Sequence, residues 1–244
     1  MKQLRNILCV FLLITVLFSC KKENRCDCFK RTGEIITVTR SVNAFDRLQV
    51  EQNVNVFITD AAVQEVKVEA GKNIEPLIET VVQDGILIIR NHNRCNWARS
   101  YDKPLNVYIK TPGLKYITSD GTGKISSQNT IVKDTFDIRI MNSGNIELTV
   151  NSGKVISHIF GAGDLTLHGR TAEHACSIGG ASFLHAEDLD TDYTWIQSYT
   201  TGNSYVFARN LFICRIDDLG DIHCTGHPPN VTKTFNGKGN LYFD

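Results

Sequence analysis

Alternating apolar and polar residues run through most of the chain, and no helical period appears in its second half. The clearest segments are VNVFIT (54–59), LNVYIK (105–110), FDIRI (136–140), IELTV (146–150) and LTLHG (165–169). Alternation of this kind predicts β-strands with one buried face and one face in solvent. We therefore expect a single all-β domain from about residue 35 to residue 244.

A turn signal built on small residues recurs between these strands. In each copy a small residue is followed two positions later by a residue that is usually apolar. The central residues are Gly123, Gly144, Gly163, Ala181, Gly202, Gly220 and Gly239. Their spacing of about 19 residues is in the range of repeat architectures.

Two architectures fit this repeat, a parallel β-solenoid with one coil per repeat and an antiparallel sandwich with a hairpin at each glycine. A sandwich needs no fixed period, so the equivalent corners favour the solenoid, with strands about 4.8 Å apart. We attribute the glycines to left-handed backbone angles at a sharp corner, which glycine adopts at little cost. Asn and Asp often follow the glycine, and we expect them to bond their own backbone.

The first nineteen residues have the features of an export signal. Lys2 and Arg5 precede an apolar run at 7–18 that is too short to span a bilayer comfortably. The run ends in LFSC, which resembles the bacterial lipoprotein box and places the lipid on Cys20. Residues 20–34 then form a tether, and acyl chains anchor the domain to a membrane. We expect a location in the bacterial cell envelope, at the outer membrane, on its periplasmic or its surface face.

The charge balance and the cysteine content limit the classes of ligand that the sequence suggests. Lys and Arg number 26 and Asp and Glu number 26, a balance that argues against nucleic-acid binding. Export permits disulfides, and Cys26 and Cys28 are too close to pair without strain, so Cys95 is a candidate partner. The same three cysteines with His92 are an alternative metal site, but their spacing matches no usual zinc pattern, so we expect no metal and no cofactor.

With the repeat laid out, the chain resembles the GIN-domain family, described as auto-transporter adhesin heads of unknown function. The resemblance is carried by VNAFDRLQVEQNVNVFI (42–58), DGILII (84–89), LNVYIKTPGLKYI (105–117) and the glycine corners through GKGNLYF. It covers roughly residues 40–244 and implies a right-handed parallel β-helix on secreted or lipid-anchored bacterial proteins. It brings no catalytic residues. Ala181 and Ser204 depart from the repeat.

The sequence contains few groups of residues that could act in catalysis or bind a metal. Glycoside hydrolysis needs two carboxylates about 5–9.5 Å apart, and the best acidic group is Asp188, Asp190 and Asp192, which we place in a loop. In HCTGH, strand geometry points His223 and Cys224 to opposite faces, which argues against a shared metal. A carbohydrate-active enzyme that uses the acidic loop is therefore an alternative interpretation, and a non-catalytic protein is the prediction.

Aromatic residues are the main sign of binding, because Tyr and Trp pack on sugars and anchor protein contacts. One group lies in the 91–103 loop and comprises Trp97 and Tyr101 with Arg94 and Arg99. A second group comprises Tyr193, Trp195, Tyr199 and Tyr205, which we place across two adjacent coils. We predict a lipid-anchored, adhesin-like protein that binds a glycan or a protein. Another alternative is an envelope protein that self-associates through the exposed edge of its last coil.

Overall fold

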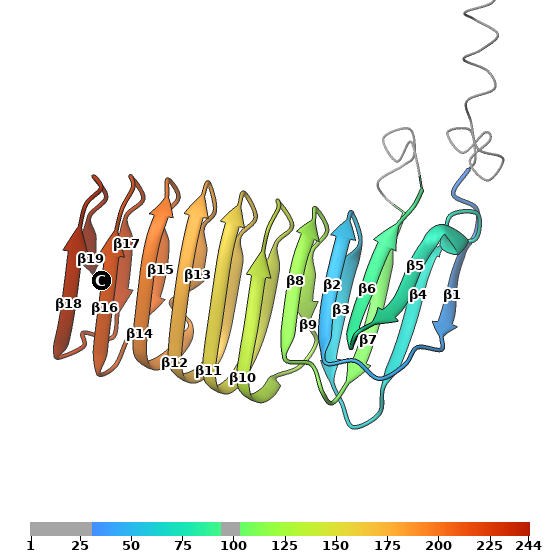
Figure 1. Cartoon of the computed structure of the whole chain (residues 1–244), viewed down its shortest axis with the longest axis horizontal. Helices are drawn as coiled ribbons and strands as arrows, with labels where there is room; N and C mark the ends of the chain where they lie inside the picture. The colour runs from blue at the N-terminus through green and yellow to red at the C-terminus, as the bar shows by residue number, and fades with distance from the viewer. Residues whose placement is uncertain (1–30, 94–102) are drawn as a thin grey trace, which may run out of the picture.

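The computed structural model describes residues 31–93 and 103–244, which form an elongated stack of β-coils (Figure 1). These residues contain no α-helix, so the predicted all-β solenoid is confirmed. The signal segment and Cys20, Cys26, Cys28 and Cys95 lie outside the described residues, as do Arg94, Trp97, Arg99 and Tyr101. Residues 31–34 precede the first strand, β1 (Ile35–Arg40).

Regular coils occupy the chain from residue 116 onward. Their strands are β8 (Tyr116–Gly121), β9 (Ile125–Ser127), β10 (Ile131–Ile140), β11 (Ile146–Gly161), β12 (Leu165–Gly180), β13 (Leu184–Ala186), β14 (Leu189–Thr200), β15 (Ser204–Phe207), β16 (Leu211–Ile216), β17 (Ile222–Thr225), β18 (Asn230–Phe235) and β19 (Leu241–Phe243). All pairings among them are parallel.

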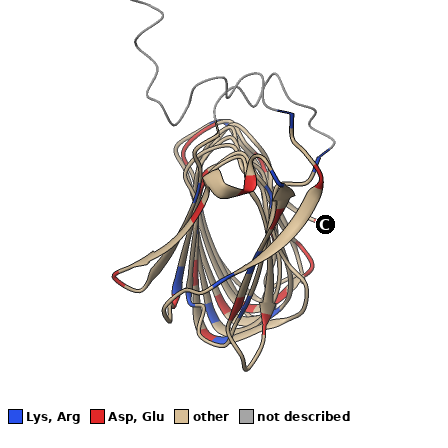
Figure 2. Cartoon of the chain, turned by 90° about the vertical axis from the view of Figure 1, so that its right-hand side faces the viewer, with Lys and Arg blue, Asp and Glu red and all other residues tan. Residues whose placement is uncertain are grey.

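The solenoid is flattened into two faces that meet at narrow turns, as the view along the stack shows (Figure 2). Face 1 contains β8, β10, β14, β16, β18 and the second halves of β11 and β12. Face 2 contains β9, β13, β15, β17, β19 and the first halves of β11 and β12. Charged residues of both signs are interspersed along the coils (Figure 2).

The core lies between the two faces and is built from register rows. One inward row on face 2 runs Ile146, Leu165, Leu184, Ser204, Ile222 and Leu241. Parallel pairing places equivalent residues of successive coils directly above one another, so one apolar position repeated every coil forms a continuous column. Ser204 departs from the apolar pattern but keeps the inward position and is fully buried.

The coils of the N-terminal region are arranged in a different order from the regular coils. Its further strands are β2 (Arg47–Gln52), β3 (Asn55–Asp60), β4 (Glu65–Gly71), β5 (Ile78–Gln83), β6 (Ile86–Asn91) and β7 (Asn106–Thr111). The coil of β2 and β3 lies between the coil of β6 and β7 on one side and that of β8 and β9 on the other. The order of these coils in space therefore differs from their order in the sequence.

Antiparallel strands close this end of the stack. On face 2, β4 pairs antiparallel with β7, and β1 pairs antiparallel with β4. On face 1, β5 pairs antiparallel with β6. The 3₁₀ turn η3 (Glu75–Leu77) crosses from β4 to β5, and its Glu75 carboxylate lies 2.5 Å from the Arg40 guanidinium. At the opposite end, β18 and β19 have no further coil beside them among the described residues (Figure 1).

The physical reason predicted for the corner glycines is wrong. None of the six corner glycines has a positive φ. Instead, a Cβ at Gly163 would collide with the carbonyl oxygen of Gly144, and one at Gly220 with that of Gly202. The column requires glycine because successive turns stack backbone on backbone with no room for a side chain.

The strand register also changes which residue occupies the middle of the column of corner glycines. Leu165 pairs with Leu184, and Leu184 pairs with Ser204. These pairings put Ser182, rather than Ala181, between Gly163 and Gly202. The signal was present in the sequence, because Leu184 continues the inward apolar row only in this register.

The Asn and Asp residues after the corner link coils instead of bonding their own backbone. The Asn145 side-chain oxygen accepts a hydrogen bond from the Asp164 backbone N–H at 2.9 Å, and the Asp164 carboxylate accepts one from Phe183 at 3.0 Å. Asn203 and Asp221 repeat the arrangement, with acceptor distances of 3.1 Å and 2.7 Å. Each side chain therefore satisfies a donor in the next coil, which ties the turns together.

Candidate ligand-binding surface

Three of the predicted aromatic residues lie together on the outer side of face 1. Tyr193, Trp195 and Tyr199 are on β14, and their exposed fractions are 49%, 39% and 41%. Residues two apart in a strand share a face, so the three side chains form a row along one strand. Tyr205 does not belong to this group, because it lies on β15 in face 2 of the same coil.

Tyr193 is in register with Glu173 and Leu211, whereas the neighbours of Trp195 and Tyr199 are apolar or small. Trp195 is in register with Ala175 on one side and Ile213 on the other. Tyr199 is in register with Gly179, and a Cβ at Gly179 would approach the Phe160 ring to 3.0 Å. Phe160 is 44% exposed, so its ring extends the aromatic surface across the position that glycine leaves open. We call Phe160, Tyr193, Trp195 and Tyr199 the aromatic surface.

Polar groups border the aromatic surface. The Gln197 amide donates a hydrogen bond to the Tyr199 hydroxyl. Arg215 donates to the Asp217 carboxylate at 2.9 Å, and Asn236 donates to the same carboxylate at 2.6 Å. The hydrogen bond from Asn236, followed by that from Arg215, lowers the pKa of Asp217. The surface thus combines exposed rings with fixed hydrogen-bonding groups, a combination suited to sugars or to a protein partner.

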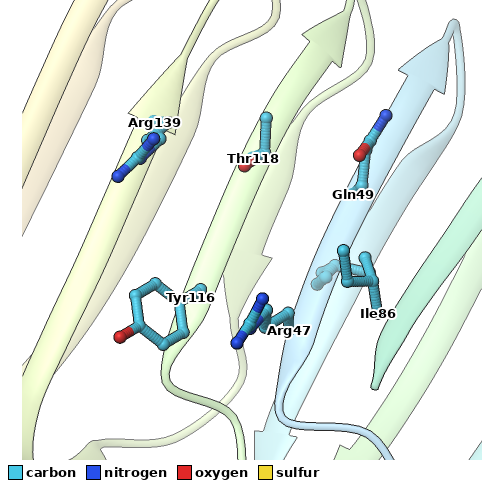
Figure 3. Close-up of a pocket in the computed structure, with 7 residues that line it drawn as sticks. Arg47, Gln49, Ile86, Tyr116, Thr118 and Arg139 are labelled. Atoms are coloured by element: carbon cyan, nitrogen blue, oxygen red, sulfur yellow. The ribbon is translucent and has the colours of Figure 1, made fainter. Parts of the chain in front are cut away.

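A hollow of about 350 Å³ lies on the same face, nearer the N-terminal end (Figure 3). Its lining residues come from four strands and are Arg47, Leu48, Gln49, Ile86, Tyr116, Thr118 and Arg139. We call it the arginine pocket. Sequence reasoning missed it, because its two arginines are far apart in the chain and only the parallel register of β2, β8 and β10 brings them together.

The predicted acidic residues form ion pairs with cations. Asp190 and Asp192 lie within β14 rather than in a loop, so that expectation is wrong for these two, whereas Asp188 lies in the turn before β14, 3.4 Å from His168. The Arg209 guanidinium lies 2.5 Å from Asp190 and 3.6 Å from Asp192, and Arg170 lies 3.8 Å from Asp192. Both carboxylates therefore join neighbouring coils through ion pairs.

Ser157, His174 and Cys176 form a polar cluster in the core between the two faces. His174 accepts or donates a hydrogen bond with the Ser157 hydroxyl at 2.9 Å, but both residues are buried in the core. Burial lowers the pKa of His174 to about 4. Burial raises the pKa of the neighbouring Cys176 thiol to about 12. This cluster packs the interior of the coils, since no surface group reaches it.

The histidines of face 2 form a ring stack. His185, Tyr205, His223 and Tyr242 stack in successive coils with ring centroids 5.5 Å, 4.8 Å and 5.0 Å apart. Stacking covers the ring faces and turns their edges to solvent, so the column stabilises the coils and offers no flat platform. His223 points outward to Asp244 while Cys224 is buried, as strand geometry predicts. Among residues 31–93 and 103–244, no three His, Cys, Asp or Glu side chains are placed to hold a metal.

No helix in the described part of the chain is long and apolar enough to cross a membrane. Cys176, Cys214 and Cys224 are free and buried.

Comparison with known proteins agrees with this architecture. The sequence profile of a family described as "Putative auto-transporter adhesin, head GIN domain" matches residues 44–228. No curated protein matches the sequence.

Several solved structures share the fold. A "putative adhesin" from Bacteroides fragilis NCTC 9343 has 21% identity and a TM-score of 0.80, covering 86% of this chain and 97% of its own. A "putative adhesin" from Parabacteroides distasonis ATCC 8503 has 18% identity and a TM-score of 0.66, covering 87% and 98%. A "Putative lipid binding protein" from the same organism has 16% identity and a TM-score of 0.68, covering 87% and 97%. The family profile spans more than half of the sequence, and the chain therefore belongs to the GIN head-domain family of adhesin-like proteins.

Proposed function

We propose that this protein is a lipid-anchored, extracytoplasmic binding protein that recognises a glycan through face 1 of the solenoid. The aromatic surface carries the proposal, because three exposed rings on β14 form a row that Phe160 extends from β11, two strands away. Exposed aromatic rings with fixed polar neighbours are the usual means of holding sugar rings. The adhesin-like family is consistent with a protein that works by binding.

A glycan screen with matched variants tests the proposal. The full chain, the Trp195→Ala variant and a control, Phe183→Ala, would be compared on the same glycan array. Phe183 is 41% exposed but lies beside β13 on face 2, so it controls for the loss of any exposed ring. We expect Trp195→Ala to weaken glycan binding about tenfold, as for the removal of a central aromatic contact. Equal binding by all three proteins would remove the aromatic surface from the proposal.

The anchor and its location need their own experiments. Metabolic labelling with a fatty acid should mark the wild-type chain and leave a Cys20→Ala variant unlabelled. Protease treatment of intact cells should then remove the domain if it faces the exterior. Protection until the outer membrane is broken would place the domain in the periplasm and argue against a role in adhesion to other cells.

Self-association is a second candidate function, favoured by the open end of the stack. β18 and β19 have unpaired edges among the described strands, and Val231, Phe235, Tyr242 and Phe243 are 40–46% exposed there. Exposed strand edges are templates for pairing with another chain. Sedimentation at increasing concentration should show association if this end joins two copies, and a monomer at all concentrations would exclude it.

A further inference from the structure

The Arg47 guanidinium of the arginine pocket lies over the Tyr116 ring and forms one long ion pair with Asp46. The Arg47 guanidinium carbon lies 5.4 Å from the centre of the Tyr116 ring, which is its register neighbour on β8. Its nearest carboxylate, Asp46, is 3.7 Å away, and the guanidinium donates no hydrogen bond to any of the described residues. Asp46 also faces Lys115, whose amine is 3.5 Å away.

A second arginine is on the other side of Tyr116. Arg139 on β10 donates to the buried Asp137 carboxylate at 3.0 Å, and this hydrogen bond fixes the side chain and raises the pKa of Arg139. Half of the Arg139 side chain remains exposed. The lining of the pocket itself contains two cations, Arg47 and Arg139, and no carboxylate, while Asp46, Asp137, Glu51 and Lys115 border it.

The remaining polar groups of the lining are two hydroxyls and the Gln49 amide, whose nitrogen also donates to the Glu51 carboxylate at 2.8 Å. Thr118 and Gln49 stand in register with Arg139 and form the next row of the pocket beyond Arg47 and Tyr116 (Figure 3). Tyr116 and Thr118 contribute two hydroxyl groups to the lining. Tyr116 is 41% exposed, so its ring is available to an apolar sugar face.

We propose that the arginine pocket binds the carboxylate of a uronic acid unit, with Arg47 as its anchor, and that the glycan is therefore acidic. Planar guanidinium groups pair with carboxylates through two parallel hydrogen bonds, a geometry that an ammonium group does not match. The hollow of about 350 Å³ is at the lower end of the size range of ligand sites, as suits a single sugar unit of a longer chain.

The position of the pocket supports a chain ligand. From β8 to β14 there are four strand spacings on face 1, through β10, β11 and β12. At about 4.8 Å each, this distance is roughly 19 Å, a length that one oligosaccharide laid across the strands covers. This inference rests on the proposed function, since the aromatic surface would hold the same glycan at a distance from the charged unit.

The test compares oligogalacturonate with its methyl ester, which has the same rings but no charge. Isothermal titration of the full chain should show at least tenfold tighter binding of the acid form. Arg47→Ala should remove this preference. Arg47→Lys should retain only part of it, because an ammonium group cannot form the two parallel hydrogen bonds of a guanidinium group. Arg170→Ala is the control, since Arg170 is an exposed arginine outside both surfaces and should leave the preference unchanged.

The outcomes separate the two proposals. Equal affinity for the acid and the ester, or a preference that survives Arg47→Ala, overturns the acidic-sugar assignment. Displacement of oligogalacturonate by equal concentrations of inorganic phosphate or acetate also overturns it, because the pocket would then bind any small anion. The glycan array with Trp195→Ala decides independently whether the proposed function stands. Neutral glycans bound through Trp195 would leave that function intact while the uronic acid site fails.

Discussion

The two halves of the stack differ in how their strands pair. From residue 116 onward each coil pairs in parallel with the coil before it, in sequence order. Before residue 112 the order of the coils in space differs from their order in the sequence. The outermost strands, β1, β4 and β5, pair antiparallel. The outer edges of β1 and β5 pair with no other described strand, as is also the case for β18 and β19, but the 3₁₀ turn η3 crosses from one face to the other at the N-terminal end. The comparison shows that extending this solenoid uses a local repeat, whereas its N-terminal end is built by non-local pairing.

The largest expected difference concerns glycine in the regular coils. Gly163→Ala should lower the free energy of unfolding by about 3 kcal/mol or more, because the new Cβ collides with the Gly144 carbonyl and backbone cannot move aside easily. Gly113→Ala in the N-terminal half is the matched control, since its Cβ would meet no atom closer than 3.7 Å. Thermal unfolding followed by circular dichroism measures both, and equal losses would contradict the backbone-stacking account.

The next largest effect is expected in the pH dependence of the free energy of unfolding, through His174 in the regular coils. Burial lowers the pKa of His174 to about 4, below its usual 6.5, so the folded state holds this histidine neutral. Its contribution is complete above pH 6.5 and is lost as the pH falls towards 4, because the unfolded chain binds the proton first. The loss should reach about 3 kcal/mol. His174→Asn should flatten the profile in this window, and an unchanged profile would show that another group is responsible.

The N-terminal cap should depend on its ion pair. Arg40→Ala leaves the Glu75 carboxylate, which is 5% exposed, without its partner 2.5 Å away. We expect a loss of about 2 kcal/mol, less than for a fully buried pair because Arg40 is partly exposed. Adding Glu75→Gln should recover part of the loss. Hydrogen exchange resolved along the sequence would show whether β1, β4 and β5 lose protection before the regular coils do.

The smallest effect is expected at the open end. Ile216 and Phe235 are register partners, but Ile216 is fully buried whereas Phe235 is 46% exposed. Phe235→Ala should therefore change stability by less than about 1 kcal/mol, while Ile216→Ala should lower it by about 3 kcal/mol. A similar loss for both variants, growing with protein concentration, would mean that another copy covers the end and that both ends of the stack are closed.

The candidate site was partly predictable. Tyr193, Trp195 and Tyr199 alternate with buried residues in one strand, so their outward direction follows from local sequence alone. The arginine pocket could not be found this way, because Arg47 and Arg139 meet only through the pairing of β2 with β8 and of β8 with β10. The acidic group was misjudged for the same reason. Its partner Arg209 lies in the next coil, and only the register shows that the charges are paired.

The sequence by itself determined the coil, since apolar alternation and a corner repeated about every 19 residues leave little other than a stack of parallel strands. Only the tertiary structure decided the order of the N-terminal coils and the antiparallel pairing of β1, β4 and β5. The physical reason is that side-chain alternation specifies which face of a strand is buried but not which strand lies beside it. That choice is made by contacts between residues distant in the chain, and the arginine pocket depends on the same contacts.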